Sequence, residues 1–340
     1  MTSIWNLPRI ETQPLHTIRE ERPCAVLTGR RAWQAVGSMF ELPIVVQAEP
    51  HTANVDFMDD LAQNLPPQVE VIYGIGGGLV ADVAKYVGWK NEIPVVLVPT
   101  ALSVDGFFTA IVAVRENKSV HYETTGPAEV VYIDWDVVSQ APANIRGTGI
   151  AEILSIVTGL LDWRYAAERN KNTPLERFKP WAAGLAAGIA QQAFKIAPGV
   201  GEGRVESLQN LLDLTCMEVR LTNQLGHNRP QEGSEQYFAY AMERKVSRIP
   251  YADLVGPGIL ISAALHGQDI GPIRATLNSA GIRLGQLRPD DMIETIKMLP
   301  EYVNEHKLPY SILHDLDPTS ESAVELLEKT GLDVSGSRPL

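Results

Sequence analysis

Residues 71–82, VIYGIGGGLVAD, decide the fold, because an apolar run leads directly into three glycines. The run has the character of a buried strand, and residues 79–89 are apolar at helical spacing. Glycines at such a junction let the backbone turn tightly and let its N–H groups approach a phosphate, whose charge the helix N-terminus favours. The stretch therefore predicts a phosphate-binding turn. A plain strand-to-helix turn is the alternative, because the stretch is neither a Walker loop nor a strict G-x-G-x-x-G fingerprint.

The residues on both sides of this turn predict an α/β protein with a Rossmann-like, mostly parallel sheet. Short β-branched runs alternate with helical stretches up to about residue 140, and only helical patterns follow. We therefore expect a nucleotide-binding α/β domain over residues 1–142 and an all-helical substrate domain over residues 143–340. The cleft between the two is the expected site. The expected strands are residues 24–29, 42–47, 69–73, 94–98 and 130–133.

Composition excludes several classes of protein. The 340 residues carry a net charge of −12, from 41 acidic and 29 basic residues, which disfavours nucleic acid and anionic membranes as partners. No apolar stretch is long enough for a transmembrane helix, and the first residues do not resemble a secretory signal. Two cysteines are too few for a disulfide framework or a cysteine-built zinc site. A cytoplasmic protein that binds a small molecule is the expectation.

A second polar loop follows the expected strand at residues 94–98. It places the hydroxyls of Thr100 and Ser103, then Thr109, close in sequence to the carboxylate of Asp105. The carboxyl ends of neighbouring parallel strands meet at one edge of a sheet, where ligands bind. The loop therefore strengthens the prediction of a nucleotide site, with an ordinary polar loop as the alternative.

At these residues the sequence resembles the family of glycerol-1-phosphate dehydrogenase, glycerol dehydrogenase, iron-containing alcohol dehydrogenases and dehydroquinate synthase. The resemblance spans about residues 20–270 and is strongest for the glycerol-1-phosphate dehydrogenase branch. The matching segments are Gly76-Gly77-Gly78 with Asp82 and Lys85, Val98-Pro99-Thr100-Ala101 with Ser103 and Asp105-Gly106, Leu161-Asp162-Trp163-Arg164, Arg229-Pro230, and Gly233-Ser234-Glu235.

The resemblance implies a dehydroquinate synthase-like fold and an NAD or NADP cofactor. By that resemblance the pyrophosphate is held by Gly76, Gly77, Gly78 and Asp82. The ribose and nicotinamide side is lined by Thr100, Ser103 and Thr109, and Asp105 reaches the substrate hydroxyls. The family also holds a divalent metal with one carboxylate and two histidines, which polarises the substrate oxygen.

This chain departs from the family at the metal ligands. Glu152 keeps a carboxylate, whereas Gln236 and Tyr251 stand where the family has its two histidines, and Tyr240 replaces a further histidine. Zinc prefers imidazole and thiolate, and an amide oxygen adds little affinity. We therefore expect that no tightly bound catalytic metal remains, although a weakly held Mg²⁺ at Glu152 stays open.

Hydride transfer can proceed without a metal if another group supplies the proton of the alcohol. Tyr251 is the candidate, as a phenol at a ligand position, with Glu152 or Asp105 tuning it. The alternative is that Tyr251 and Tyr240 only fill vacated volume. Gln236 either orients a substrate hydroxyl or only fills space.

Residues 115–125 are interpreted as a loop. Its Arg115, Lys118 and His121 either pair with a substrate phosphate or lie on a solvated turn.

The sequence therefore predicts an NAD(P)-dependent oxidoreductase that acts on a small polyol, hydroxy-ketone or sugar phosphate without a tightly bound metal. One alternative is a dehydroquinate synthase-like cyclase or lyase that uses NAD transiently. Another is a non-catalytic nucleotide-binding relative. Glu49, after the second expected strand, favours NAD without excluding NADP. The resemblance also implies a homo-oligomer.

Overall fold

The computed structural model describes residues 4–116, 119–246 and 249–332. The chain divides into two compact units. Unit 1 comprises Met1–Pro142 and Gly203–Arg220, and unit 2 comprises Ala143–Glu202 and Leu221–Leu340. Lys118 lies outside the described residues.

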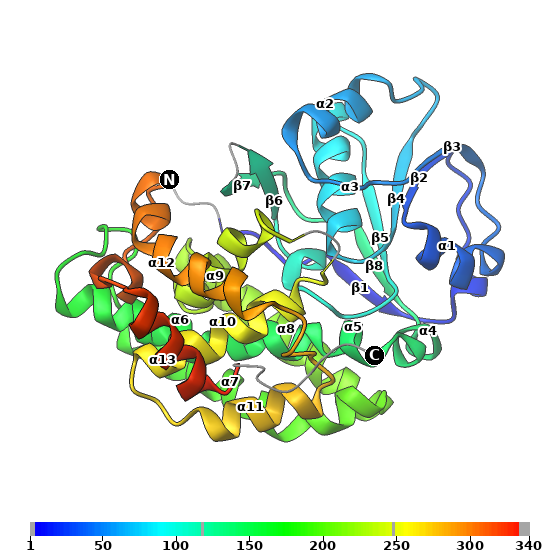
Figure 1. The fold of residues 1–340 in the computed structure, drawn as a ribbon. Coiled ribbons are helices and arrows are strands. Elements are labelled where there is room, and N and C mark those ends of the chain that lie inside the picture. Colours follow the sequence, from blue (N-terminus) through cyan, green and yellow to red (C-terminus); the bar gives the residue numbers. More distant parts are fainter. Residues whose placement is uncertain (1–3, 117–118, 247–248, 333–340) are drawn as a thin grey trace. The chain divides into compact units, whose positions relative to one another are not determined.

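Unit 1 is built on a six-stranded, all-parallel sheet in the order β1-β8-β5-β4-β2-β3 (Figure 1). Moving outward from β2, the chain adds β3 on one side and then returns to add β4 on the other. The strand order thus reverses between β2 and β4, which is where doubly wound sheets bind ligands. The strands are β1 (Arg9–Thr12), β2 (Cys24–Thr28), β3 (Ile44–Ala48), β4 (Val71–Gly76), β5 (Val95–Pro99) and β8 (Val130–Ile133).

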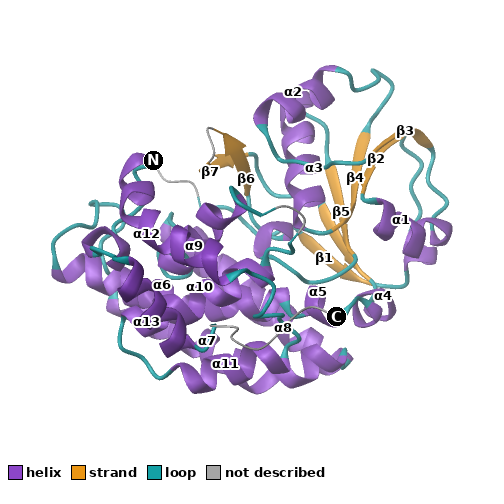
Figure 2. Ribbon diagram, in the orientation of Figure 1, coloured by secondary structure: helices purple, strands orange, loops and turns teal. Residues whose placement is uncertain are grey.

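Helices cover both faces of this sheet, because side chains alternate along each strand. One face includes Val71, Tyr73 and Ile75 of β4 and packs against Trp33 and Val36. Figure 2 shows α1 and α4 on one side of the sheet and α2 and α3 on the other. The helices are α1 (Arg30–Val36), α2 (Val55–Gln63), α3 (Gly78–Asn91) and α4 (Trp135–Gln140). A doubly wound unit of this kind confirms the expected fold class.

The structure corrects the interpretation of residues 115–125 as a loop. Within the described residues they belong to an antiparallel hairpin of β6 (Ile111–Glu116) and β7 (Ser119–Thr124). The hairpin was missed because its second strand carries polar, exposed residues such as His121 on a small two-stranded sheet. Strand β1 was also missed, since its four residues are too short and too polar to show a clear pattern.

Unit 2 is helical throughout its described residues, as expected. Helix α10 is buried along nearly its whole length, and it packs on α6 and α9. Gly159 of α6 allows close packing, because a Cβ there would lie 2.9 Å from the carbonyl oxygen of Pro230. The helices are α5 (Ala143–Arg146), α6 (Thr148–Glu168), α7 (Pro180–Glu202), α8 (Val205–Leu225, whose first part belongs to unit 1), α9 (Ser234–Glu243), α10 (Ala252–Leu265), α11 (Ile270–Ser279), α12 (Pro289–Glu305) and α13 (Ser320–Thr330).

Among the described residues, no helix is both long enough and apolar enough to span a membrane.

Candidate functional site

The glycine turn joins β4 to α3, and its three glycines meet three different requirements. Gly76 has a φ of 151°, a value that residues with a side chain rarely adopt. A Cβ on Gly78 would lie 2.8 Å from Val104 Cγ2, so only glycine lets the next loop approach this closely. A Cβ on Gly77 would meet nothing within 4 Å, which leaves the backbone open at this position.

The second polar loop lies beside the glycine turn, as expected. Pro99 of β5 is the register partner of Gly76, and the backbone N–H of Thr100 donates to the Gly76 carbonyl oxygen at 3.1 Å. Ser103 is buried and Thr100 is half-buried. Hydroxyl groups therefore lie next to an open glycine backbone at the carboxyl edge of the sheet. This combination fits a nicotinamide dinucleotide, because pyrophosphate needs close backbone approach and ribose needs hydrogen-bonding groups.

A buried charged cluster fixes the helix that follows the turn. Lys85 Nζ donates to the carbonyl oxygen of Ile111 at 2.6 Å and to both oxygens of Thr109 at 3.2 Å. Burial lowers the pKa of Lys85 to about 8 and raises the pKa of Asp82 to about 6, while their mutual attraction opposes both shifts. The Thr109 hydroxyl also donates to Ile111, so it already has two partners in the protein. The cluster ties α3 to the start of the β6–β7 hairpin.

Asp105, the predicted substrate-binding carboxylate of unit 1, lies in a short 3₁₀ helix (Asp105–Phe107) that packs against α3. It is half-buried, and its charge contributes to raising the pKa of Asp82. A Cβ on Gly106 would lie 3.7 Å from Asp82 Oδ1. The structure therefore brings Asp105 and Asp82 together in unit 1.

In unit 2, the residues at the family's histidine positions are hydrogen-bonded to one another. Tyr251 Oη donates to Gln236 Oε1 at 2.7 Å, and Tyr240 Oη lies 2.9 Å from the same oxygen. Gln236 Nε2 donates to the carbonyl oxygen of Gln231 at 3.3 Å, which defines the orientation of the amide. Gln236 is 5% exposed, so this amide oxygen serves the two phenols rather than solvent.

The donor set at these positions does not fit a tightly bound zinc ion. Glu152, half-buried on α6, is the carboxylate expected at a ligand position, and the other expected positions hold an amide and two phenols instead of imidazoles. The amide oxygen of Gln236 already accepts hydrogen bonds from phenols. No group of three or more His, Cys, Asp or Glu side chains that could hold a metal occurs among residues 4–116, 119–246 and 249–332. Zinc sites in proteins depend on such ligands.

Asp162 organises unit 2, a role that the sequence reading did not assign. Its carboxylate is fully buried and accepts hydrogen bonds from the backbone and hydroxyl of Ser234 (2.7 and 2.6 Å) and from Ile312 N (2.8 Å). Ser234 donates to Oδ2 and Ile312 to Oδ1, and His266 Nε2 also lies 3.0 Å from Oδ1. Burial alone would raise the pKa of Asp162, but these partners hold it below its usual value. The clue was the Leu-Asp-Trp and Gly-Ser-Glu segments, whose residues meet here.

Glu235 lies beside this carboxylate and is also fully buried. Its two oxygens accept hydrogen bonds from Gly233 N and from the Thr158 hydroxyl, each at 2.8 Å. Burial, reinforced by the nearby charge of Asp162, raises the pKa of Glu235 to about 8. Two adjacent carboxyl groups thus take opposite protonation states at neutral pH.

The predicted site residues form two groups. The proposed cofactor residues and Asp105 belong to unit 1, whereas Glu152, Gln236, Tyr240 and Tyr251 belong to unit 2. Within unit 2, Gln236 and Tyr251 are in direct contact.

Comparisons with known proteins agree with this architecture. Residues 15–142 match the model of the iron-containing alcohol dehydrogenase family. The chain is 31% identical over 246 residues to glycerol-1-phosphate dehydrogenase [NAD(P)+] of Methanothrix thermoacetophila. The matched region covers 71% of this chain and 67% of the relative.

Two solved structures share the fold at low sequence identity. A probable glycerol dehydrogenase from Sinorhizobium meliloti 1021 is 17% identical with a TM-score of 0.69, covering 98% of this chain and 99% of the other. Sulfoacetaldehyde reductase from Bifidobacterium kashiwanohense, solved in complex with NAD+, is 14% identical with a TM-score of 0.66, covering 98% and 100%.

Proposed function

The chain belongs to the iron-containing alcohol dehydrogenase family, with glycerol-1-phosphate dehydrogenase among its relatives, and from this premise we propose a specific activity. We propose that it is an NAD(P)-dependent oxidoreductase that acts on a small polyol, hydroxy-ketone or sugar phosphate without a tightly bound catalytic metal. The open backbone at Gly77, beside the Thr100 loop, supports the cofactor. The single observation that carries the metal-free mechanism is the hydrogen bond between Tyr251 and Gln236.

In this mechanism unit 1 holds the cofactor and part of the substrate. Gly76, Gly77 and Gly78 would bind the pyrophosphate, with Asp82 bracing the turn from α3. Thr100, Ser103 and Thr109 would line the ribose and nicotinamide side, and Asp105 would accept hydrogen bonds from substrate hydroxyls. When bound, the nicotinamide supplies or accepts the hydride.

In unit 2, Tyr251 would take over the role of the metal. Its phenol would donate a hydrogen bond to the substrate carbonyl oxygen and deliver its proton as negative charge develops there. Gln236 would hold the Tyr251 phenol in place until substrate binds, and Tyr240 would bind substrate beside it. Glu152 would tune the phenol electrostatically, a role that does not require it to hold a cation.

Three measurements on the purified protein test the proposal: metal content, titration with NADH and NADPH, and turnover of a panel of polyols, hydroxy-ketones and sugar phosphates with chelator present. We expect dinucleotide binding and chelator-resistant turnover. Binding without turnover on the panel would favour a non-catalytic relative. Conversion of a sugar phosphate with no net change in nicotinamide absorbance would favour the cyclase or lyase alternative, which Glu152 also permits.

The homo-oligomer stays a prediction, and light scattering coupled to size-exclusion chromatography measures it directly.

A further inference from the structure

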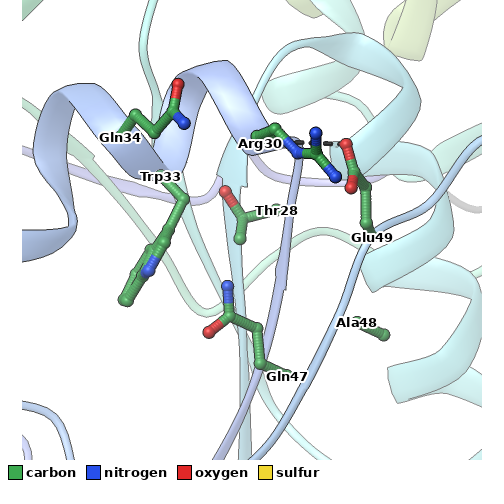
Figure 3. Close-up of a pocket in the computed structure, with 7 residues that line it drawn as sticks. All are labelled: Thr28, Arg30, Trp33, Gln34, Gln47, Ala48 and Glu49. Carbon is green, nitrogen blue, oxygen red and sulfur yellow. Dashed lines mark hydrogen bonds between the residues drawn. The ribbon is translucent and has the colours of Figure 1, made fainter.

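Unit 1 carries pockets at both edges of its parallel sheet. The pocket at the carboxyl edge, of about 550 Å³, lies where β2 and β3 end and α1 begins, and Figure 3 shows Trp33 and Glu49 among its lining residues. Thr28, at the end of β2, pairs with Ile75 directly before the glycine turn. This pocket therefore adjoins the turn and belongs to the site already described.

The second pocket, of about 500 Å³, lies at the opposite edge of the same sheet. It is formed by the last turn of α3, the start of β5 and the loop between β7 and β8. Roughly 17 Å along α3 separates Gly78 at the glycine turn from Trp89 in this pocket, which makes it a separate site. Its lining includes Trp89, Glu92, Ile93, Pro94, Pro127 and Glu129.

Backbone hydrogen bonds hold the walls of this second pocket together. The N–H of Ile93 donates to the carbonyl oxygen of Gly88 at 2.9 Å, and the N–H of Glu129 donates to that of Val95 at 2.8 Å. Gly88 allows the chain to approach, because a Cβ there would lie 2.8 Å from the Ile93 carbonyl oxygen. The end of α3 and the loop after β7 are thus both fixed at the start of β5, so the pocket is preformed, as small-molecule sites usually are.

Trp89 supplies an aromatic wall, next to the apolar side chains of Ile93 and Pro94. The tryptophan is 42% exposed, and its indole N–H makes no hydrogen bond within the described residues. Lys90 Nζ lies over the same ring, 5.3 Å from its centroid, which shows that the ring accepts an ammonium group. Lys90 does not line the pocket, so it leaves the pocket side of the ring to another partner.

The charged groups of this pocket are acidic. Within the described residues the Glu92 carboxylate makes no hydrogen bond or ion pair, and Glu129 uses one oxygen to pair with Arg22 at 3.1 Å. Glu92 is also the C-cap of α3, where a helix carries partial negative charge. Lys85 is the cation among the lining residues, but its Nζ donates to the protein oxygens described above. Negative charge therefore lies beside an aromatic surface.

The backbone of Glu92 adds a further argument. Its φ is 55°, in the left-handed region that glycine adopts at helix ends at lower cost. A carboxylate thus stands at a position where the backbone alone would favour glycine. Strained residues of this kind cluster at sites that bind ligands.

We propose that this pocket binds an organic cation, a molecule that carries a protonated amine on an apolar or aromatic body. The body would pack against Trp89, and the ammonium group would pair with Glu92 and with the second oxygen of Glu129. The net charge of −12 favours the approach of cations. This inference goes beyond the proposed function and does not require a dinucleotide.

Isothermal titration calorimetry with tryptamine tests the proposal at about pH 7, where an aliphatic amine is protonated. Tryptophol, in which a hydroxyl replaces the ammonium group, is the neutral probe of the same shape. We expect tryptamine to bind with a Kd below about 1 mM and tryptophol to bind at least about tenfold more weakly.

Three variants locate the binding. Glu92→Gln should weaken tryptamine binding about threefold or more, because it removes the charge and keeps the shape. Trp89→Ala should weaken it about tenfold, because it removes the aromatic wall. Glu41→Gln removes the same charge at an exposed position before β3, three strands away from β5, and should leave the tryptamine affinity unchanged.

Three results would overturn this inference. They are no heat of binding with millimolar tryptamine, binding of tryptophol as tight as that of tryptamine, and an unchanged tryptamine affinity in Glu92→Gln. Each of them leaves the proposed function intact, because none involves the glycine turn. Loss of dinucleotide binding, in turn, would leave this inference standing.

Discussion

The glycine turn of unit 1 and the hydrogen-bonded pair Gln236–Tyr251 of unit 2 are built from different chemical groups. The turn is built from backbone, and its function depends on side chains being absent at Gly76, Gly77 and Gly78. The Gln236–Tyr251 pair is built from side chains, which hydrogen-bond to each other. A site made of side chains can thus change its chemistry through single substitutions that leave the surrounding helices packed. A site made of backbone changes only if the turn itself is disrupted.

The largest expected effect comes from filling the open side of the glycine turn. Gly77→Leu should abolish dinucleotide binding, because its side chain would occupy the space above the turn, where the pyrophosphate has to approach. The variant should fold, since φ at Gly77 is −98° and a Cβ there meets nothing within 4 Å. Titration with NADH measures the loss.

Gly184→Leu on α7 is the matched control, because a Cβ at Gly184 also meets nothing within 4 Å. It should bind NADH normally. Normal binding by Gly77→Leu would show that the cofactor does not use this turn.

Removing the phenol oxygen of Tyr251 tests the side-chain site of unit 2. Tyr251→Phe should slow hydride transfer roughly 10²- to 10⁴-fold, the usual contribution of a general acid, with little change in NADH affinity. Single-turnover measurement of the nicotinamide absorbance separates the two quantities. Tyr310→Phe, which loses a phenol bonded to Asp315, should keep the full rate. A full rate in Tyr251→Phe would mean that this phenol only fills space.

Restoring histidines at the two positions sharpens the comparison. Gln236→His/Tyr251→His, together with Glu152, would recreate one carboxylate and two imidazoles, so zinc content should rise to about one ion per chain. Elemental analysis after dialysis against a weak chelator measures this content. Gln191→His/Lys195→His adds two imidazoles four residues apart on the exposed face of α7 and should retain far less zinc. One tightly held ion in the wild-type protein would refute the metal-free mechanism.

The smallest expected effect concerns stability in unit 2. The pKa of Glu235 is raised from 4.5 to about 8 in the folded protein, so the fold favours the protonated carboxyl. Its contribution is complete below about pH 4.5 and is lost as pH rises to about 8, because over this range the unfolded state has released a proton that the folded state still holds. The free energy of unfolding should fall on the order of 5 kcal/mol across that range.

Denaturant titrations at several pH values measure this slope. Glu235→Gln should flatten it, and Glu325→Gln, at an exposed position of α13, should not. An equal slope in wild type and Glu235→Gln would assign the pH dependence to other groups.

The sequence predicted the parts of the fold that follow from periodicity and glycine placement. Strands β2, β4, β5 and β8 are mostly buried and β3 is partly exposed, but each is an apolar run, and the Gly76–Gly78 turn marks a strand-to-helix junction. The β6–β7 hairpin was missed because β7 is polar and exposed over its last four residues, so only β6 shows an alternating pattern. The confirmed family assignment came from short segments that were specific only in combination.

The sequence predicted which residues make up the candidate site, but not which of them contact one another. Alignment placed Gln236 and Tyr251 at ligand positions, yet only coordinates show that one amide oxygen serves two phenols. The Asp162 cluster could not be derived from spacing, because its donors lie 72 to 150 residues away along the chain. Metal independence and the roles of individual site residues stay predictions that the variants above test.

The hydrogen bond from Ile312 to Asp162 has a consequence for synthesis of the chain. A buried carboxylate that loses one of its donors is destabilised, so α6 and α9 gain their full stability only once the segment around Ile312 has been made. Unit 2 thus completes its interior only after that segment has joined α6. A chain cut before that segment should leave α6 less stable and more open to proteolysis.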